Sequence, residues 1–162
     1  MHMKKIVVMA VALLSTVAAN AQFESGKKYC GASLTGLNLS YNGSQELNLG
    51  IQAKAGYFVD DDWMLLGQAE YSHSSKTDPK DYFSVGAQGR YYIEQNGLYL
   101  GVGAKLVHAG SYNDVMPGVE IGYAFFVGKQ VTIEPALYYD QSFKNHSDYS
   151  TVGLKIGIGV YL

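Results

Sequence analysis

The sequence of 162 residues contains a single cysteine, Cys30, so it cannot form an intramolecular disulfide bond. Charged residues make up only 16% of the chain, below the usual quarter of a globular protein. Acidic residues (14) slightly outnumber basic ones (12), and no stretch forms a basic stripe. This composition argues against nucleic acid as a partner.

Long apolar runs are also missing, except at the N-terminus, and a helical membrane protein would need runs of about 18 residues or more. Lys4 and Lys5 precede the apolar residues 6–14, and Ala19-Asn20-Ala21 supplies a small-x-small cleavage site. This pattern predicts a signal peptide over residues 1–21 and a mature domain over 22–162. A membrane-anchor helix is the alternative, but the run is short and is broken by Ser15 and Thr16.

What the sequence does contain is strict alternation, clearest in its last segment. Residues 150–162 place aliphatic side chains on one parity and small or polar ones on the other. Because successive side chains of a strand point to opposite faces, one face of this strand is wholly aliphatic. The aliphatic set is Val152, Leu154, Ile156, Ile158, Val160 and Leu162, and the opposite set is Gly153, Lys155, Gly157, Gly159 and Tyr161.

Eight such segments follow one another, with turn residues between them. Asn42-Gly43-Ser44 is a hairpin signal, and the polar stretches 60–62, 76–81, 95–97, 110–114, 128–130 and 144–149 read as connections. An even number of strands fits an all-β fold, an eight-stranded antiparallel up-and-down transmembrane β-barrel, with 60–62, 95–97 and 128–130 at the end that holds the termini. The expected strands are residues 29–41, 45–59, 63–75, 82–94, 98–109, 115–127, 131–143 and 150–162.

Pro135 falls in the middle of the seventh expected strand. A closed barrel has no free edge at which the missing N–H of a proline is harmless. The sequence therefore predicts a bulge or a shifted register at this position.

Alternation alone does not say which face points inward, and a soluble lipocalin-like barrel has the opposite sense. The polar parity is rich in glycine and glutamine and carries about one charge per strand, unlike a water-facing sheet. On the apolar parity, Trp63 and Tyr71, and then Phe83 and Tyr91, stand eight residues apart. In a tilted strand this spacing is about 20 Å, close to the apolar band between aromatic girdles. We therefore expect the apolar face to meet lipid, with these four aromatics at the membrane interfaces.

The polar parity then fills the lumen, and it includes four basic and four acidic side chains. An eight-stranded lumen is only wide enough to be filled by side chains, so buried charges must pair. Counting residues along the strands places Lys54, Glu70, Lys105, Glu120 and Lys155 at similar heights. A salt-bridged polar core is the favoured interpretation, and an ion path or a catalytic carboxylate cluster is the alternative. The eight residues are Lys54, Glu70, Arg90, Lys105, Glu120, Glu134, Asp140 and Lys155.

These features together resemble the small outer-membrane β-barrel domain family, the porin-like and OmpX-type eight-stranded barrels of Gram-negative bacteria. The resemblance rests on the Ala19–Gln22 exit site, the eight alternating segments and the amphipathic last strand. Members usually end in Phe, whereas this chain ends in Leu162. The resemblance implies an outer-membrane location, contact with outer-membrane lipid, insertion by the barrel-assembly machinery, and a monomer.

Catalytic motifs are scarce. His73 and Ser75 share a parity, and His-x-Ser resembles the pair of outer-membrane lipid A deacylases, although Lys76 replaces that family's Asn and no acidic partner is evident in the sequence. His2, His108 and His146 do not have the spacing of metal ligands, so neither a metal nor another cofactor is expected. The sequence favours a non-enzymatic structural or surface-interaction barrel, with a lipid-modifying enzyme or a narrow small-solute pore as alternatives.

Overall fold

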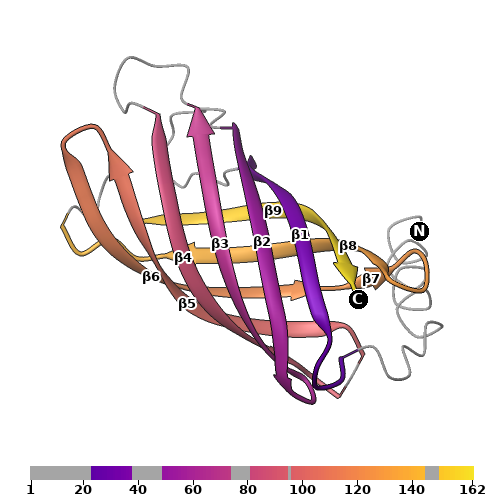
Figure 1. Ribbon diagram of the computed structural model, residues 1–162. Coiled ribbons are helices and arrows are strands. Elements are labelled where there is room, and N and C mark those ends of the chain that lie inside the picture. Colours follow the sequence, from indigo (N-terminus) through magenta and orange to yellow (C-terminus); the bar gives the residue numbers. More distant parts are fainter. Residues whose placement is uncertain (1–22, 38–48, 74–80, 95, 145–149) are drawn as a thin grey trace, which may run out of the picture.

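A computed structural model describes residues 23–37, 49–73, 81–94, 96–144 and 150–162 (Figure 1). The predicted signal peptide, the Asn42-Gly43-Ser44 hairpin, Ser75 and most of the loops at 76–81 and 144–149 lie outside these residues. The strands are β1 (Lys28–Leu37), β2 (Leu49–Asp60), β3 (Trp63–His73), β4 (Tyr82–Tyr92), β5 (Leu98–Ala109), β6 (Tyr112–Tyr123), β7 (Phe125–Phe126), β8 (Val131–Asp140) and β9 (Thr151–Tyr161).

All strand pairs are antiparallel, and the sheet closes on itself. The strand order is β6-β5-β4-β3-β2-β1-β9-β8-β7, and an additional pairing of β6 with β8 joins the two ends. β7 follows β6 after one residue and pairs with the same strand, β8, so the two act as one strand of the barrel. The predicted closed, eight-stranded antiparallel barrel is therefore confirmed. In the described part of the chain, no helix is long and apolar enough to cross a membrane.

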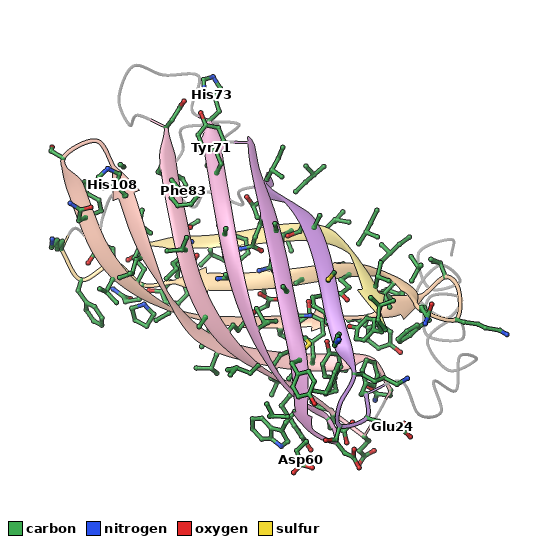
Figure 2. The ribbon with its side chains drawn as sticks, viewed as in Figure 1. Glu24, Asp60, Tyr71, His73, Phe83 and His108 are labelled. Carbon is green, nitrogen blue, oxygen red and sulfur yellow. The ribbon has the colours of Figure 1, made fainter. Side chains whose placement is uncertain are left out.

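The start of β1 and the end of β9 lie at the same rim of the barrel. Tyr29 is paired with Tyr161 there, and the tight connections after β2, β4 and β7 share this rim through backbone hydrogen bonds. Examples are the bonds from Tyr92 N to Asp62 O and from Tyr161 N to Gln130 O, both 2.8 Å long. We call this rim the inner end and the opposite one the outer end. Figure 2 shows Glu24 and Asp60 at the inner end and Tyr71, His73, Phe83 and His108 toward the outer end.

The connection between β5 and β6 is shorter than the sequence predicted. The expected loop 110–114 is wrong, because Tyr112 pairs with Ala109 and Asp114 pairs with Val107. Only Gly110 and Ser111 remain in the turn, and Gly110 has a positive φ of 61°. These polar residues can belong to a strand because the barrel satisfies their side chains. Asp114 is buried, and its carboxylate accepts hydrogen bonds from Tyr112 and Ser142.

The bulge or shifted register expected at Pro135 is also wrong. The pairing of β8 with β9 runs without a shift from Val131 to Asp140. On the other side of β8, Gly122 lies opposite Ala136 and Phe125 lies opposite Ile133, so the register is the same before and after Pro135. The barrel accommodates the proline by an interruption of the ladder between β6 and β7, with no inserted residue.

The wall of the barrel is apolar outside and polar inside. Val102 and Ile51 expose 65% and 62% of their surface, and aliphatic side chains of every long strand with described side chains share this outward face. Charged residues such as Lys54 and Glu120 are buried on the inward face. This is the opposite of a soluble barrel, whose core is apolar and whose surface is polar.

Glycines on the inward face let neighbouring strands and long side chains approach closely. A Cβ on Gly86 would lie 2.5 Å from the carbonyl oxygen of Ala104 and 2.9 Å from the Cα of Lys105. Backbone atoms cannot move aside cheaply, so we expect Gly86→Ala to lower the free energy of unfolding by about 1–3 kcal/mol. Urea titration of refolded protein in micelles measures this. Gly128→Ala is the control, since a Cβ there meets nothing within 4 Å; equal effects of the two substitutions would contradict the prediction.

Candidate functional site: the polar lumen

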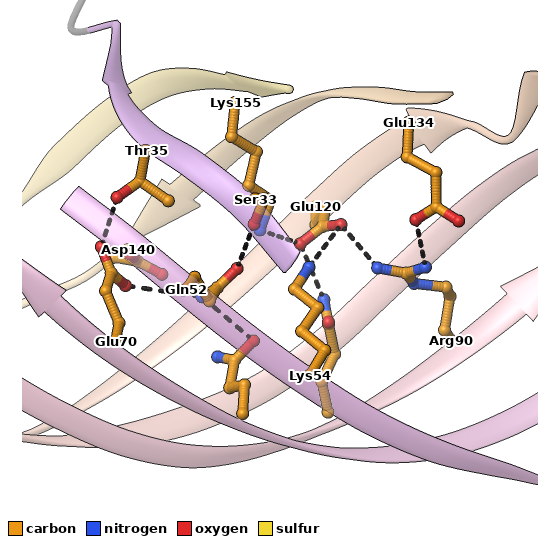
Figure 3. Close-up of polar contacts among 12 residues, drawn as sticks. Ser33, Thr35, Gln52, Lys54, Glu70, Arg90, Glu120, Glu134, Asp140 and Lys155 are labelled. Atoms are coloured by element: carbon orange, nitrogen blue, oxygen red, sulfur yellow. Dashed lines mark hydrogen bonds and ion pairs between the residues drawn. The ribbon is translucent and has the colours of Figure 1, made fainter. Parts of the chain in front are cut away.

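The eight charged residues predicted for the lumen all point inward, and they form two groups. Figure 3 shows the contacts around Glu120 and Glu134. Glu120 is the centre of the inner group. Its carboxylate lies 3.1 Å from Arg90 Nη2 and 3.6 Å from Lys54 Nζ, and it also pairs with Lys155. Tyr99 and Gln88 donate further hydrogen bonds to it, at 3.0 and 3.2 Å. One carboxylate thus gathers three cations, and each of these four charged side chains comes from a different strand.

Arg90 joins Glu120 to a second carboxylate, Glu134. The side chain of Arg90 is fully buried, and its Nη1 lies 3.1 Å from Glu134 Oε2. Glu134 also accepts hydrogen bonds from Tyr29 at 2.8 Å and from Tyr161 at 2.9 Å. The guanidinium carbon lies 3.9 Å from the centre of the Tyr99 ring, a cation–π distance. A planar guanidinium with two carboxylates and an aromatic face leaves little freedom for rearrangement.

The outer group is built around Lys105. Its Nζ lies 2.6 Å from Asp140 and 3.8 Å from Glu70. Glu70 accepts hydrogen bonds from Thr35 at 2.7 Å and from Tyr82 at 3.3 Å. The sequence placed Glu70 and Lys105 at the height of Glu120, but the structure assigns them to a separate group. Strand tilt and stagger decide which inward side chains meet across a barrel, and residue counting does not capture them.

Lys105→Ala tests the outer group. The substitution leaves two carboxylates, Asp140 and Glu70, without their shared cation, and we expect a loss of about 1–3 kcal/mol in unfolding free energy. The heat-dependent shift in gel mobility of the refolded barrel should then occur at a lower temperature. An unchanged transition in both Lys105→Ala and Glu70→Ala would contradict the role of these pairs.

A small polar cavity lies between the two groups. Its volume is about 30 Å³, and its lining includes Gln88 and Glu120 from the inner group and Glu70, Lys105 and Asp140 from the outer group. Gln88 Oε1 faces no hydrogen-bond partner among the described residues. Such a volume holds one or two water molecules and excludes a larger solute.

An aromatic floor closes the lumen at the inner end. Phe23 precedes β1, is fully buried, and stacks on Tyr92 with ring centres 4.1 Å apart. Tyr92 and Tyr161 share a hydrogen bond of 2.9 Å, which links this floor to Glu134. Inward parity at the inner ends of strands is a signal for most of these residues, but nothing in the sequence marks Phe23. The members of the floor are Phe23, Tyr29, Phe58, Met64, Leu66, Tyr92, Tyr99, Ala124, Ala136 and Tyr161.

The four predicted interface aromatics lie on the outer face of the wall. Trp63 is paired with Tyr91 near the inner end, with ring centres 4.8 Å apart. Tyr71 is paired with Phe83 near the outer end. Further aromatic side chains share this outward face, and the apolar parity of their positions is a signal in the sequence that could have revealed them: Tyr57, Tyr123 and Phe125.

At the outer rim, His73 has the acidic partner that the sequence did not reveal. Its Nδ1 lies 2.8 Å from Asp81 Oδ1, and Tyr71 donates to Asp81 Oδ2 at 2.7 Å. His108 lies apart and contacts Asn113 at 2.5 Å. Within the described ranges, no group of three or more His, Cys, Asp or Glu side chains is arranged to hold a metal ion.

Several solved structures superpose on this chain. The N-terminal β-barrel domain of Pseudomonas aeruginosa OprF superposes with a TM-score of 0.63 at 13% identity, covering 85% of this chain and 98% of that one. Neisserial surface protein A (NspA) gives 0.58 at 17% identity, covering 83% and 95%. The outer membrane protein Ail of Yersinia pestis gives 0.57 at 16% identity, covering 85% and 100%.

This chain has the fold of the small eight-stranded outer-membrane β-barrels. No protein-family model matches it, and no curated protein sequence does. Since almost the whole length of each solved barrel aligns with this chain at low sequence identity, the similarity concerns architecture. Side-chain chemistry inside this barrel has to be argued from its own residues.

Proposed function

We propose that the protein is an outer-membrane β-barrel with a salt-bridged, closed lumen and a structural or surface-interaction role without turnover. The observation that carries the proposal is the inverted wall, which exposes aliphatic side chains while four cations and four carboxylates point into the lumen. An exposed aliphatic belt of this size is unfavourable in water and favourable in lipid. Trp63, Tyr71, Phe83 and Tyr91 would then lie at the two interfaces.

The same proposal covers the route and the surroundings of the protein. A signal peptide over residues 1–21 would direct export, the barrel-assembly machinery would insert the domain, and outer-membrane lipid would surround a monomer. A surface-interaction role is supported by the fold relatives: Ail, an attachment invasion locus protein, has been crystallised with the heparin analogue sucrose octasulfate. The contact surface of this chain would lie at the outer end.

Planar-bilayer conductance tests the closed lumen. With paired charges in the middle and the aromatic floor at the inner end, we expect the refolded protein to give no stable single-channel current. Parallel fractionation of cells should recover the protein with the outer membrane. Steady conductance would favour the small-solute pore, and recovery in the soluble periplasm would refute the membrane location.

A lipid-modifying enzyme is the second candidate, favoured by one observation. Asp81 holds the His73 imidazole at 2.8 Å at the rim where lipid headgroups would lie, an arrangement that can orient a general base. Mass analysis of lipid A from cells with the wild-type protein and with His73→Ala tests this. A lipid A species that depends on expression and disappears with His73→Ala would replace the proposal made above.

A further inference from the structure

We call the line along which β6 and its continuation β7 meet β8 the β6–β8 seam. Backbone hydrogen bonds across this seam show which neighbouring strand the nitrogens of Pro117 and Pro135 face. Gln141 N donates to Pro117 O across this seam, and Val127 N donates to Val131 O. The odd-numbered residues of β6, of its continuation and of β8 therefore form the hydrogen-bonded pairs of the seam. In an antiparallel ladder, a residue directs its N–H and its C=O to the same side. Pro117 and Pro135 therefore both direct their missing N–H into the β6–β8 seam.

Pro135 stands opposite Tyr123, given the common register of the pairs 122–136 and 125–133. A hydrogen-bonded pair exchanges two N–H···O bonds, and Pro135 can supply only the acceptor. The pairing with β8 accordingly breaks between β6 and β7 at this point. The pairing of β8 with β9, on the other side of β8, has no interruption, since the backbone nitrogen of Pro135 points away from β9.

Toward the outer end, the same seam changes from ladder to side-chain contacts. In the described residues, the pairing of β6 with β8 runs from Gly118 to Gly122, while β6 itself begins at Tyr112. Beyond Gly118 the described residues are joined by a backbone bond from Gln141 N to Pro117 O at 2.8 Å. Side-chain bonds from Ser142 Oγ to Asp114 at 2.6 Å and from Lys144 Nζ to Asn113 O add to it.

The lumen cavity adjoins the outer end of the β6–β8 ladder, where Gly118 pairs with Asp140. Met116, Gly118 and Val119 of β6 and Tyr138 and Asp140 of β8 line it. Val119 also exposes 53% of its surface, on the outward face, so the cavity and the exterior are separated there by little more than the backbone of β6.

From these observations we propose that the β6–β8 seam is the place where the barrel wall opens, and that this opening connects the lumen cavity with the exterior face of the barrel. Both prolines remove ladder donors from this one seam, so the seam separates before the rest of the wall. The inference concerns the barrel itself and holds whether or not the lumen conducts ions.

Hydrogen exchange of backbone amides in refolded protein in phospholipid nanodiscs tests the proposal. Amides that bond across β6–β8 should exchange at least about ten-fold faster than those across β3–β4. Pro135→Ala restores a donor opposite Tyr123 and should slow exchange at the seam several-fold. Ile133→Ala, two residues away on the same strand, trims an outward side chain without adding a donor and should give no slowing.

Thiol labelling tests the connection to the cavity. In a Cys30→Ser background, Met116→Cys places a thiol at the cavity, and Met64→Cys places one in the aromatic floor. Labelling by N-ethylmaleimide should be faster at position 116, and adding Pro135→Ala should slow it there while leaving position 64 unchanged. Uniform amide exchange around the barrel would overturn the proposal, and so would rates of exchange and labelling that do not change with Pro135→Ala. A conductance result bears only on the proposed function.

Discussion

Glu120→Ala is expected to destabilise the barrel by about 3–5 kcal/mol, the usual cost of removing one partner from a buried ion pair. Glu120 is the shared counter-ion of Lys54, Arg90 and Lys155. Without it, three cations face one another in the lumen, and among the described ion pairs only that of Arg90 with Glu134 remains to them. Urea titration of the refolded barrel, followed by the heat-dependent gel shift, measures the loss.

A matched control separates charge pairing from a general effect of removing a glutamate. Glu24 is exposed at the inner end, so Glu24→Ala should change the unfolding free energy by no more than about 0.5 kcal/mol. Glu120→Gln keeps the size of the side chain and removes its charge, and it should be nearly as damaging as the alanine. A Glu120→Gln protein with wild-type stability would show that packing, and not charge, is what Glu120 contributes.

Phe23→Ala is expected to cost about 3–5 kcal/mol, because it removes a fully buried aromatic ring and leaves a cavity. The ring stacks on Tyr92 and lies 5.6 Å from the centre of Tyr161. The backbone is tied as well, since Asp62 N donates to Phe23 O at 2.8 Å. Loss of the ring should therefore also loosen the connection after β2, visible as faster amide exchange at Asp62.

Phe143→Ala is the matched control for Phe23, since it removes the same side chain from a position that is 74% exposed. It should leave the unfolding transition within about 0.5 kcal/mol of the wild type. If Phe23→Ala unfolds like Phe143→Ala, the segment before β1 is not part of the barrel's core.

The strand pattern is predictable because its cause is local. Side chains alternate along any strand, so the two faces of a lipid-facing barrel appear in the sequence as two alternating sets of residues. Parity, together with the scarcity of charge on the polar set, therefore assigns Ile51 and Ile156 to the outward face and Lys54 and Lys155 to the inward face. It also marks the position of Pro135 as unusual, but the consequence of that proline depends on which neighbouring strand its missing N–H would face.

By itself, the sequence determined the class of the barrel, the number of strands and the list of side chains on each face, because each follows from neighbours along the chain. The tertiary structure decided which of them meet. The stagger of the strands brings Lys54 to Glu120 and Lys105 to Asp140. Closure of the sheet places both Pro117 and Pro135 on one seam, and the chain before β1 folds back to lay Phe23 across the inner end. These contacts join residues far apart in the chain, and only the closed geometry of the barrel specifies them.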